Sequence, residues 1–281
     1  MPPPPVVLSI AGSDSGGGAG IQADLKTFHA HGTFGTTAIT AVTVQNTRGV
    51  TAVHPIPADI VRGQIRAVAE DLRPAACKTG MLATAELVRA VAAECRAHSL
   101  DNLVVDPVMV SSSGDRLLDA DAEGALAAEL LPLASVVTPN LDEAAILVGF
   151  PVRTPDAMRR AALALVEMGA AAALLKGGHL EGEELVDILL DGREWHEWRR
   201  PRLHARGSHG TGCTLSAAIA AGLAHQRPLR QAVEDALDFV QRAMASAPAL
   251  GSGHGPLNHL LPATTPPRLA GSPSPAPPGD R

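Results

Sequence analysis

The run of residues 207–214, Gly-Ser-His-Gly-Thr-Gly-Cys-Thr, opens an Ala-rich stretch that is typical of a long helix. Its glycines permit a tight turn that aims several backbone N–H groups at one point. The start of the helix adds N–H groups without intrahelical partners and the positive end of the helix dipole. The run therefore predicts a pocket for a phosphate or for a transition-state oxyanion, and an ordinary glycine turn is the alternative.

Cys213 lies where such a pocket would hold a reacting group. The dipole at a helix N-terminus favours the thiolate form of a cysteine, which is its nucleophilic form. Covalent catalysis would also require a histidine within reach, and His209 is close in sequence. A cysteine among Thr and Ala residues is equally typical of a small buried hydrophobic side chain.

Two further segments place polar side chains directly after predicted strands. In residues 138–143, Thr-Pro-Asn-Leu-Asp-Glu, the residues Asn140 and Glu143 have the spacing of a helix capping box. The functional alternative is that Glu143 holds water around Mg²⁺, which prefers oxygen ligands. Lys176, which precedes Gly-Gly-His, offers a mobile positive charge to a phosphate, or it is a solvated lysine before a glycine turn.

The glycine-rich segment 12–20, Gly-Ser-Asp-Ser-Gly-Gly-Gly-Ala-Gly, follows a short apolar strand. It does not fit the GxGxxG pattern of a dinucleotide site, and it lacks the lysine of the GxxxxGK[ST] loop. We therefore expect a close-packed turn that lets a small ligand touch the backbone. Asp24, one turn into the following helix, is either a surface carboxylate or a hydrogen-bond partner of that ligand.

Strand and helix patterns alternate along the chain, which predicts an α/β fold with a central, mostly parallel sheet and helices on both faces. The polar residues singled out above follow strands, where ligands collect in such sheets. In the helix expected at 57–72, we expect Ile60, Ile65 and Val68 in the core. Strands are expected at 6–11, 33–45, 50–56, 75–78, 102–106, 135–138, 172–176, 185–190 and 195–199, and helices at 57–72, 85–98, 121–131, 141–149, 157–169, 211–225 and 229–245.

Composition limits the function classes. Aromatic residues make up 2% of the chain, Tyr is absent and the net charge is −6, so nucleic acid and anionic membranes are poor partners. The three cysteines form no CxxC pair, which argues against a disulfide framework or zinc site and favours the cytoplasm. Neither a signal peptide nor a membrane span is expected. We expect one domain over residues 1–261 and a disordered Pro/Ser/Gly-rich tail over 262–281.

Taken together, the ordered motifs resemble the hydroxymethylpyrimidine/phosphomethylpyrimidine kinases of thiamine biosynthesis, within the ribokinase-like superfamily. The resemblance implies a ribokinase-like fold and an ATP-dependent enzyme. The implied substrate is 4-amino-5-hydroxymethyl-2-methylpyrimidine, and then its monophosphate. The matching segments span about residues 6–260 and are 11–27, 44–47, 78–82, 106–109, 138–143, 176–179 and 209–216.

The resemblance also implies roles for single residues. Gln45 matches the residue that hydrogen-bonds the aminopyrimidine. The same pocket is expected to be lined by Ala19, Gly20, Asp24, Met81 and Val108.

For ATP, the resemblance implies that Asn140 and Glu143 organise Mg²⁺ and phosphates. It also implies that Lys176 and Thr211 contact the nucleotide. Gly210 and Gly212 match the anion hole. Cys213 stands where sugar kinases of the superfamily carry an Asp base. We infer that it accepts or orients the hydroxyl proton, in the thiolate form or as a group that only shapes the pocket.

A pyridoxal kinase is the nearest rival, because it phosphorylates a similar ring alcohol. A sugar kinase is disfavoured by the missing Asp. A catalytically silent pyrimidine-binding protein is the rival from another class. Relatives of this kind are commonly dimers, so a homodimer is expected.

Overall fold

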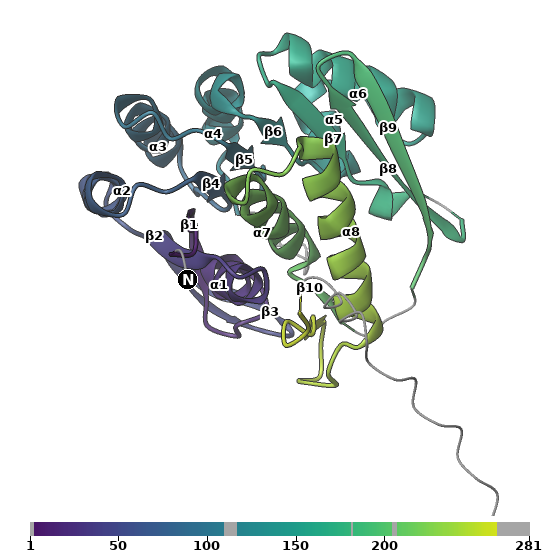
Figure 1. Ribbon diagram of the computed structural model, residues 1–281, viewed down its shortest axis with the longest axis horizontal. Coiled ribbons are helices and arrows are strands. Elements are labelled where there is room, and N and C mark those ends of the chain that lie inside the picture. The colour runs from purple at the N-terminus through teal and green to yellow at the C-terminus, as the bar shows by residue number, and fades with distance from the viewer. Residues whose placement is uncertain (1–2, 110–116, 181, 204–206, 263–281) are drawn as a thin grey trace, which may run out of the picture.

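The computed structural model describes residues 3–109, 117–180, 182–203 and 207–262, and in this part of the chain nine strands form one sheet (Figure 1). Their order is β3-β2-β1-β4-β5-β6-β7-β8-β9. The run from β2 to β7 is parallel, whereas β3, β8 and β9 are antiparallel to their neighbours. The strands are β1 Val6–Asp14, β2 Phe34–Asn46, β3 Gly49–Pro55, β4 Ala76–Thr79, β5 Leu103–Val105, β6 Val136–Val137, β7 Ala172–Leu175, β8 Glu184–Asp191 and β9 Glu194–Pro201.

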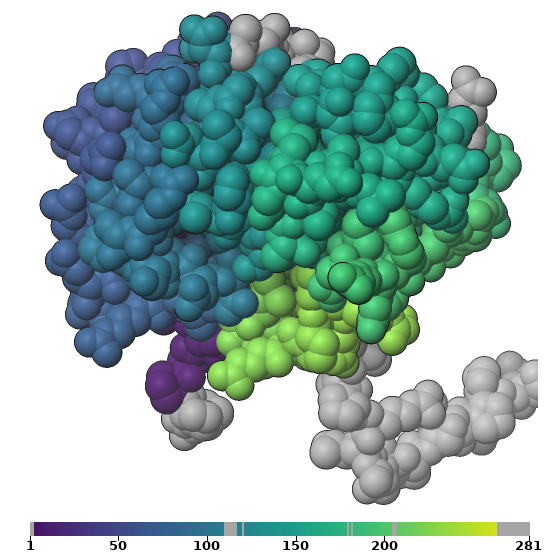
Figure 2. Space-filling view, turned by 90° about the horizontal axis from the view of Figure 1, so that it is seen from above, coloured from purple at the N-terminus to yellow at the C-terminus, as the bar shows by residue number. Residues whose placement is uncertain are grey.

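Helices cover both faces of this sheet, as the alternation predicts. One face packs against α1, α7 and α8, and the other against the helices from α2 to α6 (Figure 1). The space-filling view shows the first half of the chain, in blue, packed directly against the teal and green second half (Figure 2). The helices are α1 Gly20–Ala30, α2 Ala58–Asp71, α3 Ala85–Ala97, α4 Ala120–Ala125, α5 Leu141–Val148, α6 Pro155–Glu167, α7 Thr211–Ala224 and α8 Leu229–Ala245.

The strands are apolar on both sides because successive side chains enter different cores. Val7 and Val104 pack against α7 and α8, whereas Leu8 and Val105 pack against the opposite helices. Side chains alternate across a strand, so a continuous apolar run is what a doubly covered sheet requires.

Two expectations of the sequence differ from the structure. Ile60 is 53% exposed and is not part of the core, because α2 turns Val61 and Ile65 inward. Ile65 and the partly buried Val68 lie in or against the core as expected. The helix expected at 121–131 is α4 followed by a wider turn over Leu126–Leu130 and a tight turn over Leu131–Leu133. Pro132 accounts for the change, since it has no N–H for an α-helical hydrogen bond.

A small pairing near the C-terminus was not predicted. Gly207–His209 forms β10, which pairs with β11, Gly255–Pro256. These segments are too short to show a strand pattern in sequence. No helix of the described residues combines the length and apolar character that a bilayer crossing needs. The tail expected to be disordered lies outside the described residues beyond position 262.

Candidate active site

The carboxyl ends of β1, β4, β5 and β7 border a cavity of about 720 Å³. The glycine-rich segment 12–20 and the first turn of α7 form much of its wall. Every site residue predicted from the sequence lines this cavity except Asp24. Residues that are nearly two hundred positions apart in the chain therefore meet at one edge of the sheet. Ligands of such folds bind at this edge, outside the carboxyl ends of the strands.

Asp14 organises the glycine-rich segment from within. Its Oδ1 accepts the N–H of Gly16 at 2.7 Å, and its Oδ2 accepts the N–H groups of Gly18 at 3.0 Å and Ala19 at 2.8 Å. Burial alone would raise the pKa of Asp14, but the hydrogen bonds from His209 and the backbone lower it below its ordinary value. These N–H groups donate to Asp14 and are not free to bind a phosphate. The segment is therefore a close-packed turn, as the sequence predicts.

His209 connects that turn to Gln45, the residue predicted to bind the pyrimidine. Its Nε2 lies 3.0 Å from Asp14 Oδ2 and 3.2 Å from Gln45 Nε2. The side chain of Gln45 also accepts the hydroxyl of Thr43 at 3.1 Å. Nε2 of His209 is thus engaged by Asp14 and Gln45, and a pairing of His209 with Cys213 stays a prediction.

The turn before α7 has a glycine that no other residue can replace without strain. Gly210 has a φ of +83°, and a Cβ there would lie 1.9 Å from the carbonyl oxygen of Gly18. Two residues later, a Cβ on Gly212 would lie 3.3 Å from Lys176 Nζ. The ammonium of Lys176 thus lies close to the first turn of α7, and a cation beside N–H groups without intrahelical partners suits the binding of an anion.

Lys176 stands between two carboxylates at the same edge. Its Nζ lies 3.1 Å from Asp106 Oδ1 and 3.9 Å from Glu143 Oε2. Burial alone would lower the pKa of Lys176, but the two carboxylates raise it, so the ammonium stays charged. The hydroxyl of Ser216, in the second turn of α7, donates to Asp106 Oδ2 at 3.2 Å and ties this helix to the group.

Asn140 and Glu143 form the capping box that their spacing predicts. Asn140 Oδ1 accepts the N–H of Glu143 at 3.0 Å, and Glu143 Oε2 accepts the N–H of Asn140 at 2.8 Å. Burial raises the pKa of Glu143 to about 7, against the opposing effect of Lys176. The capping role is compatible with a role near a metal ion, because a nearby cation stabilises the ionised form of a buried carboxylate.

Mg²⁺ fits this donor set only with a ligand from the substrate. Among the described residues, no group of three or more His, Cys, Asp or Glu side chains is arranged to hold a metal. Mg²⁺ is commonly held by one or two carboxylates, several waters and the phosphates of a nucleotide. Glu143 and Asp106 supply such carboxylates.

Cys213 is partly buried in the first turn of α7. Burial raises its pKa to about 11, while Lys78 and the N–H of Gly20 oppose the shift. Removal from water therefore raises the pKa of Cys213 more than the helix dipole lowers it, and a catalytic role for its thiolate stays a prediction.

Asp24 is also placed differently from the sequence expectation. Its side chain is fully buried below the cavity, where Lys78 Nζ lies 3.1 Å from Oδ1 and 3.0 Å from Oδ2. The hydroxyl of Ser9 donates to Oδ2 at 2.6 Å. With both oxygens occupied, Asp24 supports the floor of the cavity instead of lining it.

Comparisons with known proteins decide the family. A sequence model described as phosphomethylpyrimidine kinase matches residues 14–258. The chain belongs to this family. It is 52% identical over 258 residues to a hydroxymethylpyrimidine/phosphomethylpyrimidine kinase of Rhizobium meliloti (strain 1021), covering 91% of this chain and 97% of that protein.

Solved structures agree with the fold of the family. A Bacillus subtilis pyridoxal kinase in complex with ADP has a TM-score of 0.84 at 36% identity, over 91% of this chain and 97% of that one. A phosphomethylpyrimidine kinase from Clostridium difficile 630 has a TM-score of 0.77 at 41% identity, over 85% of this chain and 99% of that one. The prediction of a ribokinase-like kinase is confirmed.

Three charged residues of the site lie in segments that the sequence singles out, but none of them was predicted to have a role of its own. Asp14, Lys78 and Asp106 all line the cavity. Lys78 and Asp106 carried a signal, since each stands at or just after the end of a predicted strand. Asp14 had none beyond its place among glycines.

Proposed function

We propose that the protein transfers the γ-phosphoryl group of ATP to the hydroxymethyl group of 4-amino-5-hydroxymethyl-2-methylpyrimidine and then phosphorylates the monophosphate. The observation that carries the proposal is the convergence of Gln45, Lys176 and Cys213 on one cavity. A ring-binding amide, a phosphate-binding ammonium and a helix N-terminus are the parts that such a transfer needs.

The cavity divides the roles between its two walls. Gln45 hydrogen-bonds the aminopyrimidine, with Ala19, Gly20, Met81 and Val108 around the ring. This arrangement brings the hydroxymethyl group toward Cys213, which orients or accepts its proton. Asp24 acts on this pocket only through Lys78.

The phosphates occupy the other wall. Lys176 and Thr211 bind the nucleotide, and the N–H groups around Gly210 and Gly212 stabilise charge on the transferred group. Asn140 keeps Glu143 in place by the capping box. Bound Mg²⁺, held by Glu143 and Asp106, would neutralise phosphate charge.

The test is the mass of the product after incubation with the pyrimidine, ATP and Mg²⁺. Monophosphate followed by diphosphate is expected. Monophosphate alone would restrict the protein to the first step. Pyrimidine binding without consumption of ATP would instead indicate the catalytically silent protein.

Pyridoxal phosphorylation is a second candidate because solved relatives that include pyridoxal kinases share this fold closely. Incubation with pyridoxal, alone and in competition with the pyrimidine, separates the two activities. We expect a kcat/KM for the pyrimidine that is higher than that for pyridoxal.

We further propose a homodimer whose contact includes the exposed valines of β2 and β3. Val42, Val44 and Val53 are 45%, 59% and 38% exposed, and a second copy would cover them. Light scattering of the purified protein tests this, and Val44→Lys is expected to shift the mass toward the monomer. The cysteines Cys77, Cys95 and Cys213 are free thiols, a state that the cytoplasm, our proposed compartment, maintains.

A further inference from the structure

A fully buried cation forms part of the floor of the cavity. Lys78, at the end of β4, has a side chain with 0% exposure, as does its partner Asp24 on α1. Burial alone would lower the pKa of Lys78, but Asp24 raises it above its ordinary value, so the ammonium is charged. Ser9 on β1 holds Asp24 in turn, at 2.6 Å. Burying such a pair is costly unless every partner is in place, so three elements fix the position of this ammonium.

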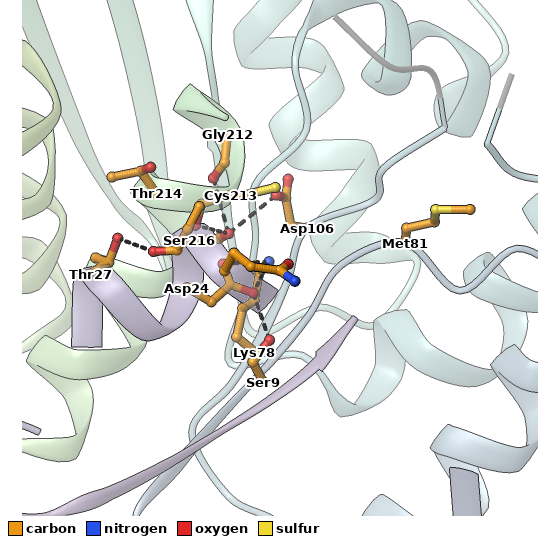
Figure 3. A network of polar contacts seen from close by, with 12 residues as sticks. Ser9, Asp24, Thr27, Lys78, Met81, Asp106, Gly212, Cys213, Thr214 and Ser216 are labelled. Atoms are coloured by element: carbon orange, nitrogen blue, oxygen red, sulfur yellow. Dashed lines mark hydrogen bonds and ion pairs between the residues drawn. The ribbon is translucent and has the colours of Figure 1, made fainter. Parts of the chain in front are cut away.

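The ammonium lies at the boundary of the substrate pocket. A Cβ on Gly80 would lie 3.0 Å from Lys78 Nζ, which shows how little space separates this nitrogen from the strand end. Lys78 and Cys213 both line the cavity. Figure 3 shows Lys78 and Asp24 next to the turn of α7 that carries Cys213.

Four charged groups act on the sulfur of Cys213 from the surrounding elements. Lys78 from β4 has the largest charge effect and favours the thiolate, and Lys176 after β7 also attracts it. Asp24 from α1 and Asp106 after β5 act in the opposite direction. The N–H of Gly20 donates to the sulfur. Lys78 is therefore the main group that compensates for the removal of Cys213 from water.

We propose that Lys78, fixed by Asp24, is a positioning residue for phosphoryl transfer: its ammonium stabilises negative charge on Cys213 Sγ, so that this sulfur accepts the proton of the substrate hydroxyl. The inference rests on the proposed function. Cys213 first releases its own proton to water. The hydroxyl O–H bond of the substrate then breaks, its proton goes to the Sγ thiolate, and its oxygen bonds to the γ-phosphorus. The bond from that phosphorus to the β–γ bridging oxygen breaks, and ADP leaves with the electron pair. The thiol then returns its proton to water.

The test compares Lys78→Met with Lys26→Met, which removes the same charge from the exposed face of α1. The rate of Cys213 alkylation by iodoacetamide is measured against pH without substrate, with the modified peptide identified by mass spectrometry. In Lys78→Met we expect the rate near pH 8 to fall about tenfold, as the curve moves up by about one pH unit. The Lys26→Met curve is expected to match that of the unaltered protein.

Activity gives the second readout. We expect Lys78→Met to lower kcat about tenfold and to leave the KM for ATP within about twofold, since the role is at the hydroxyl end. The double variant Lys78→Met/Asp24→Asn removes both charges of the buried pair, so it leaves no unpaired buried charge. It is measured in the same way, which keeps the test valid if the single variant does not fold. A folded variant that lacks Lys78 but has an unshifted alkylation curve overturns the proposal. The alkylation curve needs no turnover, so failure of the unaltered protein to phosphorylate the pyrimidine would count against the proposed function separately.

Discussion

Lys176 and Asp106 form an ion pair across the carboxyl edge of the sheet, with Nζ 3.1 Å from Oδ1, although seventy residues separate them in the chain. Asp106 is 2% exposed, so little water screens this ion pair. The pair holds the ammonium at the first turn of α7, where a Cβ on Gly212 would meet Lys176 Nζ. A phosphate that reaches this turn therefore meets an ammonium already in position.

Lys176→Met is expected to lower kcat on the order of a hundredfold and to raise the KM for ATP, because a fixed positive charge beside the transferred group is lost. It also leaves Asp106 buried without its cation, which we expect to cost about 3 kcal/mol of unfolding free energy. Steady-state kinetics and urea unfolding measure both effects. Lys26→Met is the control, and equal kinetics in the two variants would remove Lys176 from the nucleotide site.

Cys213→Ala is expected to lower kcat on the order of a hundredfold while the Kd for ATP is unchanged, since the thiol acts on the hydroxyl proton and not on the nucleotide. Single-turnover phosphorylation and ATP titration separate the two quantities. Cys213→Ser, which keeps a proton-carrying group, should retain more activity than Cys213→Ala. An unaltered kcat in Cys213→Ala would mean that the cysteine only shapes the pocket.

Gln45→Ala is expected to raise the KM for the pyrimidine about tenfold, because one or two hydrogen bonds to the ring are lost. The KM for ATP should not change. Gln64→Ala is the matched control, since Gln64 on α2 bonds the backbone of Ile39 and does not line the cavity. Indistinguishable pyrimidine KM values in the two variants would exclude Gln45 from the ring site.

Gly210→Ala and Gly63→Ala are expected to change stability in opposite directions. At Gly210 the φ of +83° and the carbonyl of Gly18, 1.9 Å from the new Cβ, should cost more than about 2 kcal/mol. Gly63 lies in α2 with nothing within 4 Å of a new Cβ, so alanine there should add about 0.5–1 kcal/mol. Urea unfolding at equilibrium measures both, and a stable Gly210→Ala protein would contradict the described turn.

His259→Gln is expected to weaken the pH dependence of stability. His259 Nε2 lies 2.9 Å from the hydroxyl of Thr214, and burial lowers the pKa of His259 from 6.5 to about 4. Between these values the unfolded chain binds a proton that the folded protein does not. The free energy of unfolding therefore falls as the pH drops through this window, by at most about 1.4 kcal/mol per pH unit for one group.

Urea unfolding of both proteins at several pH values between 4 and 7.5 measures the difference. Glutamine keeps a hydrogen-bonding group near Thr214 but does not titrate, so the slope of its stability against pH should be shallower. Parallel curves would show that His259 titrates alike in the folded and unfolded chains.

The order of the elements and most of the cavity wall were determined by local sequence. Apolar strands alternate with helical stretches, and this pattern suffices for a doubly covered sheet because each element must bury its apolar side. The capping box at Asn140 and Glu143 was also predictable, since both partners lie within one helical turn. The residues after the strands then had to meet, because parallel strands end at one edge.

The tertiary structure alone decided which charges face each other. Asp24 is paired with Lys78, fifty-four residues away, and His209 lies against Asp14 across one hundred and ninety-five residues. No local pattern records such pairs, since they depend on the register between strands and on how deeply each helix packs. The same reason explains Cys213: the helix dipole that the sequence shows favours a thiolate, but burial, which only packing sets, raises the pKa of the thiol to about 11.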